Sequence, residues 1–143
     1  MTNNLLLPLY TAFAPFVAWM IEQVIPLPFV VEEVIKMFLV LLYRGNDEGW
    51  RYRMRLGMMI GIIFALSESI FYLSMILSSG SFWVYLTRLA YTIPMHVVTS
   101  LFIVFSFRNK RKWSILIGLF AACVLHWLYN KFLGHPPFGA MVI

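Results

Sequence analysis

The stretch PFVVEEVIKMF, residues 28–38, places two glutamates and a lysine in otherwise apolar sequence. A charged side chain near the centre of a bilayer costs roughly 2.5–3.5 kcal/mol on insertion scales. What these three ionisable groups imply depends first on whether the segment lies in a membrane, where such residues usually face a polar interior. The rest of the chain answers that question.

The composition favours a protein embedded in lipid. Of 143 residues, 62% are hydrophobic and 12% are charged, with a mean hydropathy of +0.82. Soluble domains are about a quarter charged. The formal net charge is +5, but the basic residues form two short clusters between apolar runs, which indicates contact with lipid headgroups and excludes nucleic-acid binding. We expect one domain over residues 1–143, without an internal disulfide because Cys123 is the only cysteine.

Apolar runs long enough to cross a membrane recur along the chain. They predict an all-α polytopic membrane protein with five transmembrane helices, at about residues 5–25, 29–43, 56–77, 82–107 and 114–133. The prolines of "IPLP" separate the first two, and the polar stretches "RGNDEGWRYRMR", "SSGS" and "RNKRKW" separate the others. "MTNN" lacks the basic start of a secretory signal, so the first run is expected to be a retained span.

The charges of the loops predict the orientation. Both basic clusters follow even-numbered spans and fall on one side: Arg44, Arg51, Arg53 and Arg55 in one, and Arg108, Lys110, Arg111 and Lys112 in the other. The loops on the opposite side carry no charge. By the positive-inside rule, the N-terminus lies inside and the C-terminus outside.

Four ionisable residues on different spans lie at a similar depth. Counted from the basic end of each helix, they are 11 or 12 residues along it, about 16–18 Å at 1.5 Å per residue: Glu32, Glu68, His96 and His126. Helical spacing lets Lys36 pair with either Glu32 or Glu33, and it places Asn130 one turn after His126. Small residues such as Gly61 could hold the helices together at less cost. We therefore expect one shared polar cavity near the midplane, opening toward the outer leaflet, with Arg88 near the outer interface.

Such a site suits hydrolysis of a peptide bond, which needs a base for water and a group that stabilises the oxyanion. One of the adjacent glutamates can act as the base while the other pairs with Lys36. The histidines can serve as oxyanion donors or as metal ligands, and three Glu and His ligands with an open position suit catalytic zinc. A small proton-coupled transporter or channel is an alternative, because carboxylates and histidines at midplane also relay protons.

Four motifs in order resemble those of the PrsW family of intramembrane proteases, within the CAAX protease/Abi (CPBP) superfamily. They are "EEVIK" (32–36) for E-E-x-x-K, "GIIFALSESIFY" (61–72) for F-x-x-x-E, "RLAYTIPMH" (88–96) for the Arg and His motif, and "HWLYN" (126–130) for H-x-x-x-N. Lys36 and Glu68, in place of Arg and His, favour the PrsW branch.

The resemblance implies roles for these residues. Glu32 or Glu33 would activate water, Asn130 would be an oxyanion or orienting donor, and the metal ligands or water-positioning groups would be Glu68, His96 and His126. PrsW-like enzymes are usually classed as metalloproteases, with zinc the first candidate, whereas CAAX proteases look like metal-independent glutamate proteases. The resemblance also implies a membrane-anchored, anti-sigma-factor-like protein substrate and a place in the inner (cytoplasmic) cell membrane. A catalytically silent scaffold of the same superfamily remains an alternative.

Overall fold

The computed structural model describes residues 6–43, 49–78, 82–108 and 111–133. The regular structure in these ranges is entirely helical, as the sequence predicts. Five helices follow one another along the chain: α1 (Leu6–Glu22), α2 (Pro28–Tyr43), α3 (Trp50–Ser78), α4 (Phe82–Ser106) and α5 (Lys112–Phe132).

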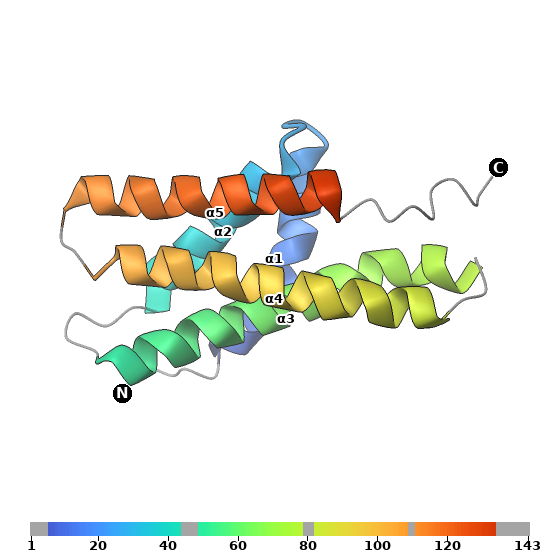
Figure 1. Cartoon of the computed structure of the whole chain (residues 1–143), viewed down its shortest axis with the longest axis horizontal. Coiled ribbons are helices and arrows are strands. Elements are labelled where there is room, and N and C mark those ends of the chain that lie inside the picture. Colours follow the sequence, from blue (N-terminus) through green and yellow to red (C-terminus); the bar gives the residue numbers. More distant parts are fainter. Residues whose placement is uncertain (1–5, 44–48, 79–81, 109–110, 134–143) are drawn as a thin grey trace.

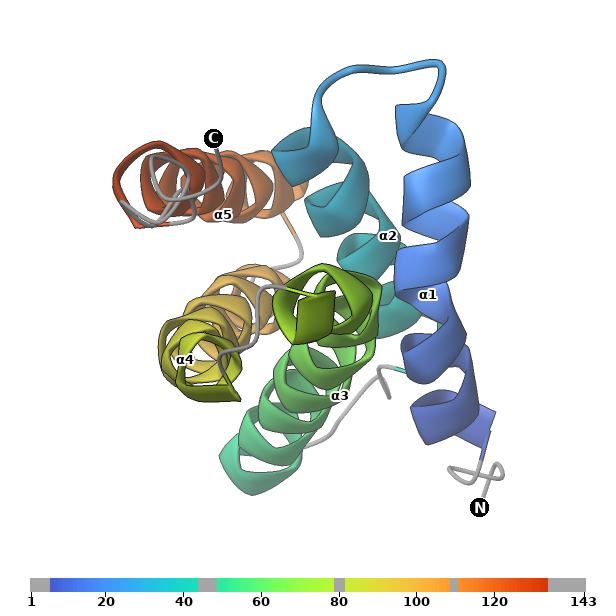
Figure 2. The ribbon, with the colours of Figure 1, turned by 90° about the vertical axis from the view of Figure 1, so that its right-hand side faces the viewer.

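The three C-terminal helices run antiparallel and side by side, whereas α1 and α2 form a hairpin that crosses them obliquely (Figures 1 and 2). The closest packing is between α3 and α4, followed by α4 and α5. Helix α2 lies in the middle of the molecule and contacts α1, α3, α4 and α5. The hairpin thereby carries the charged stretch of α2 onto the inner faces of α4 and α5.

Most helix ends lie within three residues of the predicted ones, but the start of α3 does not. This helix begins at Trp50 rather than near residue 56, so Arg51, Arg53 and Arg55 lie on a helix and not in a loop as predicted. Arginine is a good helix former, and hydropathy measures preference for lipid rather than helix formation. Trp50 stacks on Phe105 of α4 with 4.5 Å between ring centroids, which fixes the polar start of α3 beside the end of α4. Residues 44 and 110 lie outside the described ranges.

The outer surface is apolar. Large hydrophobic side chains such as Phe13, Met20, Phe120 and Phe132 are at least 60% exposed. Soluble monomers rarely expose such side chains in quantity. By length and composition, α4 and α5 are each able to cross a membrane.

Glycines allow the helices to approach closely. A Cβ atom added to Gly61 of α3 would lie 2.5 Å from the Cα of Val97, and one added to Gly118 of α5 would collide with the Cβ of Ser106; both facing residues are on α4. Real Cβ atoms do not approach neighbours this closely. Small residues at both seams therefore set the position of α4, the helix that carries His96 and Arg88.

We expect Gly61→Ser to destabilise the protein by about 1–3 kcal/mol, because the added Cβ meets the backbone of α4, which cannot move without separating the two helices. The matched control is Gly49→Ser, since a Cβ at Gly49 has nothing within 4 Å. Thermal unfolding of both variants in the same detergent measures the difference. Equal midpoints for the two variants would show that the α3–α4 approach does not limit stability.

Candidate active site

The charged residues of α2 occupy the centre of the molecule. Glu33 and Lys36 are fully buried and Glu32 is 8% exposed. From α4 and α5 they meet His96 and His126, which are 0% and 2% exposed. The structure thus brings together the residues that the sequence places at a common depth, although they come from separate helices.

Lys36 joins α2 to α4. Its Nζ atom lies 2.7 Å from Oε1 of Glu33, 2.6 Å from Nδ1 of His96 and 3.2 Å from Oγ1 of Thr99. The same ammonium is 4.7 Å from the ring centroid of Phe64 on α3, a distance at which a cation is attracted to an aromatic face. Every donor of Lys36 is therefore directed at a partner inside the protein.

His126 distinguishes the two adjacent glutamates. Its Nδ1 lies 2.7 Å from Oε1 of Glu33, whereas its Nε2 lies 3.9 Å from Oε2 of Glu32, which is too long for a hydrogen bond. Glu33 is consequently held by both Lys36 and His126. The Oε2 atom of each glutamate is buried and has no hydrogen-bond partner among the described residues. Because Oε1 of Glu33 is bound twice and Glu32 has only the 3.9 Å approach to His126, Glu32 is the less committed carboxylate.

Glu68 and Arg88 form the other end of the cluster. Oε2 of Glu68 lies 2.6 Å from Nε2 of His96, and Oε1 of Glu68 lies 3.3 Å from a terminal nitrogen of Arg88. The side chains of Glu68 and Arg88 are each 15% exposed. An unbroken series of polar contacts therefore runs from Arg88 through Glu68, His96, Lys36 and Glu33 to His126.

One set of three side chains has the composition and spacing of a metal site. Donor atoms of Glu32, His96 and His126 all lie within 4.8 Å of one another. The sequence-based set contains Glu68 in place of Glu32; in the structure Glu68 reaches this group through His96. Imidazole and carboxylate ligands suit zinc, and a buried carboxylate oxygen without a hydrogen-bond partner is available to an ion. These residues fit a divalent metal.

Asn130 is half-buried on α5, one turn after His126. Its side chain takes no part in the polar contacts of the described residues. Thr99 is a site residue that sequence reasoning missed, although its position three residues after His96 on a buried helix face is a usable signal. Phe64, interpreted from sequence as a packing residue, lies beneath Lys36 and 5.2 Å from the His96 ring.

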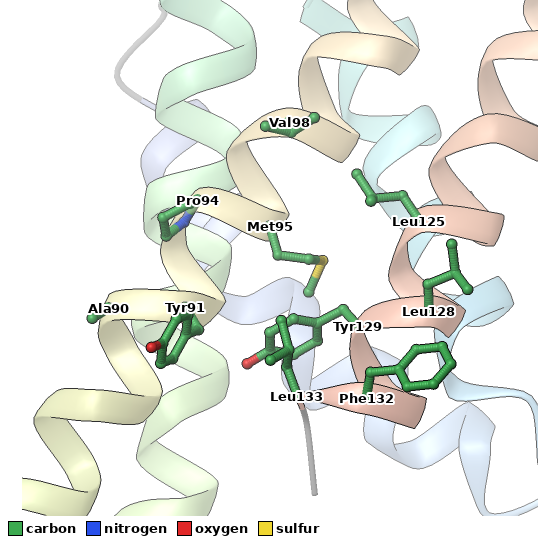
Figure 3. Close-up of a pocket in the computed structure, with 10 residues that line it drawn as sticks. All are labelled: Ala90, Tyr91, Pro94, Met95, Val98, Leu125, Leu128, Tyr129, Phe132 and Leu133. Atoms are coloured by element: carbon green, nitrogen blue, oxygen red, sulfur yellow. The ribbon is translucent and has the colours of Figure 1, made fainter. Parts of the chain in front are cut away.

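A pocket of about 500 Å³ lies between α4 and α5 and has an apolar lining (Figure 3). On α4 its walls include Ala90, Pro94 and Val98. Pro94 and Val98 are two residues from His96, roughly 200° around the helix, so the pocket faces away from the charged cluster. The polar cavity expected to open toward the outer leaflet is a different feature and stays a prediction.

The helical fold, the apolar exterior and the buried cluster define a class of protein: a helical membrane protein with a polar, charged cluster between its helices. The chain belongs to the PrsW family, because the model of the family described as PrsW family intramembrane metalloprotease matches residues 2–143. Comparisons with curated proteins and with solved structures found no match.

Membership in this family identifies the chain as a membrane protein and an intramembrane protease that acts on membrane-bound protein substrates. It also accords with the motifs quoted from the sequence, which lie on α2, α3, α4 and α5 in order. Each motif contributes at least one residue to the buried cluster.

Proposed function

We propose that the chain hydrolyses a peptide bond of a membrane-tethered protein inside the bilayer, and that Glu32 is the residue that activates water. The observation that carries this proposal is the difference between the two glutamates. Glu33 is fully buried and bound on one oxygen by Lys36 and His126. Oε2 of each glutamate has no partner among the described residues. Glu32 differs in that its approach to Nε2 of His126 is 3.9 Å, and in that its side chain is 10% exposed where that of Glu33 is 0% exposed.

In this proposal each remaining residue has a separate task. Lys36 neutralises Glu33 and holds α2 against α4. His126 donates its Nδ1–H to Glu33, so its unprotonated Nε2 faces the region of Glu32, where it can accept a hydrogen bond from the attacking water or bind a metal ion. Asn130, one turn further on α5, is proposed to orient the substrate carbonyl beside His126.

A divalent metal, with zinc the first candidate, would be held by Glu32, His96 and His126. When bound, it supplies an acidified water and polarises the carbonyl. In that case Glu32 binds the ion instead of accepting the proton of the water. Binding through Nδ1 of His96 would also require Lys36, 2.6 Å away, to give up that contact.

We further propose that all five helices are embedded in the inner cell membrane, with the N-terminus inside and the C-terminus outside. The basic residues at the start of α3 and those around the α4–α5 connection lie at the same end of the three-helix layer (Figure 1). The Trp50–Phe105 stacking joins these two regions. A membrane-anchored protein resembling an anti-sigma factor is the proposed substrate, on the strength of the family resemblance.

The function is tested with purified protein in detergent and a single-span protein substrate. We expect cleavage, and we expect His126→Ala to lose it, since this residue lies beside both glutamates. A divalent metal that is bound by the wild-type protein and lost together with activity on chelation would make Glu32 a ligand. The control is His135→Ala, which changes a histidine outside the motifs. Activity that survives chelation without bound metal would instead assign Glu32 as the direct base. Absence of cleavage, with proton flux into liposomes that depends on Glu68, would replace the protease by a proton carrier.

A further inference from the structure

The ring of His96 is held from both sides. Nζ of Lys36 lies 2.6 Å from Nδ1, and Oε2 of Glu68 lies 2.6 Å from Nε2. A lysine ammonium can only donate hydrogen bonds, so Nδ1 must accept and the ring hydrogen must be on Nε2. That hydrogen is then donated to Glu68, and both contacts select the same tautomer.

Glu68 is itself fixed in place. Its second oxygen lies 3.3 Å from the Arg88 guanidinium, and Arg88 is on the same helix as His96, two turns earlier. The carboxylate from α3 thus bridges two side chains of α4. Phe64 and His126 pack against the imidazole with ring centroids 5.2 Å and 5.3 Å away, so the ring has a single orientation.

Among the described residues, the hydrogen bond to this ring is the contact that joins Glu68 to Lys36 and the glutamates of α2. The close group of potential ligands consists of Glu32, His96 and His126 and does not include Glu68. Histidines that bind a metal or act in a site commonly donate their other N–H to a carboxylate, which sets the tautomer and the direction of the ring. The position of Glu68 matches that outer carboxylate.

We propose that Glu68 is a positioning residue, which keeps Nδ1 of His96 directed at the centre of the cluster, with Arg88 holding Glu68 in turn. This inference rests on the proposed protease function. In this inference Glu68, the glutamate of the F-x-x-x-E motif, accepts a hydrogen bond from His96. It neither binds a metal nor acts as a base. A neutral acceptor of the same length should therefore substitute for it.

The test compares three replacements. Glu68→Gln keeps an oxygen that can accept from Nε2–H, and we expect it to retain at least about a tenth of wild-type cleavage. Glu68→Met has similar length but no acceptor, and we expect a loss of about 10–100-fold, the usual cost of removing such a partner. Glu68→Asp keeps the charge on a side chain one methylene shorter, so it should also lose activity. Glu22→Gln, at the end of α1, is the matched control.

A spectroscopic signal separates positioning from packing. In protein labelled with ¹⁵N-histidine, the Nε2–H proton of His96 should appear far downfield and be protected from exchange. It should persist in Glu68→Gln and vanish in Glu68→Met and Glu68→Asp, while the melting temperatures show that the variants are folded. If Glu68→Met does not fold, Glu68→Gln and Glu68→Asp still show whether the hydrogen bond to Nε2 positions the His96 ring.

Two outcomes would overturn the inference. Glu68→Gln as inactive as Glu68→Met would mean that the carboxylate itself binds a metal or takes a proton. Full activity of Glu68→Asp, or loss of the Nε2–H signal in Glu68→Gln, would mean that the hydrogen bond does not position His96. If the wild-type protein cleaves nothing, the protease proposal fails, and the proton resonance alone still tests the positioning.

Discussion

Glu32→Gln is expected to lower peptide-bond cleavage by at least about 100-fold, because it removes the carboxylate that we propose activates water. General bases contribute about 10²–10⁴ to enzymatic rates. A metal-dependent mechanism predicts a loss as well, since Glu32 is then a ligand. The measurement is the initial rate of cleavage of a single-span substrate by purified variant protein. Folding should be nearly unchanged, because one oxygen of Glu32 has no partner to lose in the described structure.

The control for this variant is Glu22→Gln, the same chemical change in a half-buried glutamate at the end of α1. It should cleave at the wild-type rate. A Glu32→Gln protein that keeps most of its activity would remove Glu32 from the mechanism and return the role of base to Glu33.

Breaking the Glu33–Lys36 pair is expected to cost about 3–5 kcal/mol of folding stability, because either single change leaves an unpaired buried charge. Both side chains are 0% exposed and their charged atoms are 2.7 Å apart. Lys36→Met should therefore unfold well below the wild-type temperature. The Glu33→Gln/Lys36→Met double variant removes both charges, and its loss should be smaller than the sum of the two single losses. Thermal and denaturant unfolding in detergent provide all four values.

Lys131→Met is the matched control for the lysine, since Lys131 is exposed at the end of α5 and lies over the ring of Trp127. Its unfolding temperature should change little. Additive losses in the double variant would show that Glu33 and Lys36 do not stabilise each other, and Glu33 would then be as free to act in catalysis as Glu32.

Much of the fold was predictable because lipid imposes a simple pattern on sequence. Apolar runs, prolines and basic clusters place the five helices, and their ends agree with the structure except at α3. The first turns of α3, from Trp50 onward, are polar but helical. A hydropathy pattern does not detect a helix that extends beyond the apolar region. The oblique crossing of α1 and α2 depends on side-chain packing between helices, which one sequence does not reveal.

The sequence indicated which ionisable residues lie together, apart from Thr99, but not how they pair. Depth along each helix brings Glu32, Glu68, His96 and His126 to one level. Spacing alone allows Lys36 to pair with Glu32 four residues away or with Glu33 three residues away. In the structure Lys36 pairs with Glu33, because α2 is rotated so that these two side chains face α4 and α5. There Thr99 contacts Lys36 and His126 contacts Glu33. The link between Glu68 and His96 likewise depends on the close α3–α4 approach at Gly61.

The central place of α2 has a consequence for how the protein is made. This helix leaves the ribosome before α4 and α5 exist, yet its charged side chains find their partners on those later helices. Until then each charge opposes transfer from the translocon into lipid. In the proposed five-span topology, the Glu33–Lys36 pair within α2 would have to suffice until then, and we expect stable insertion of the N-terminal hairpin only once the last third of the chain is made. A chain that ends before α5 would leave Glu33 without His126, so truncated products should be recognised as incomplete and degraded.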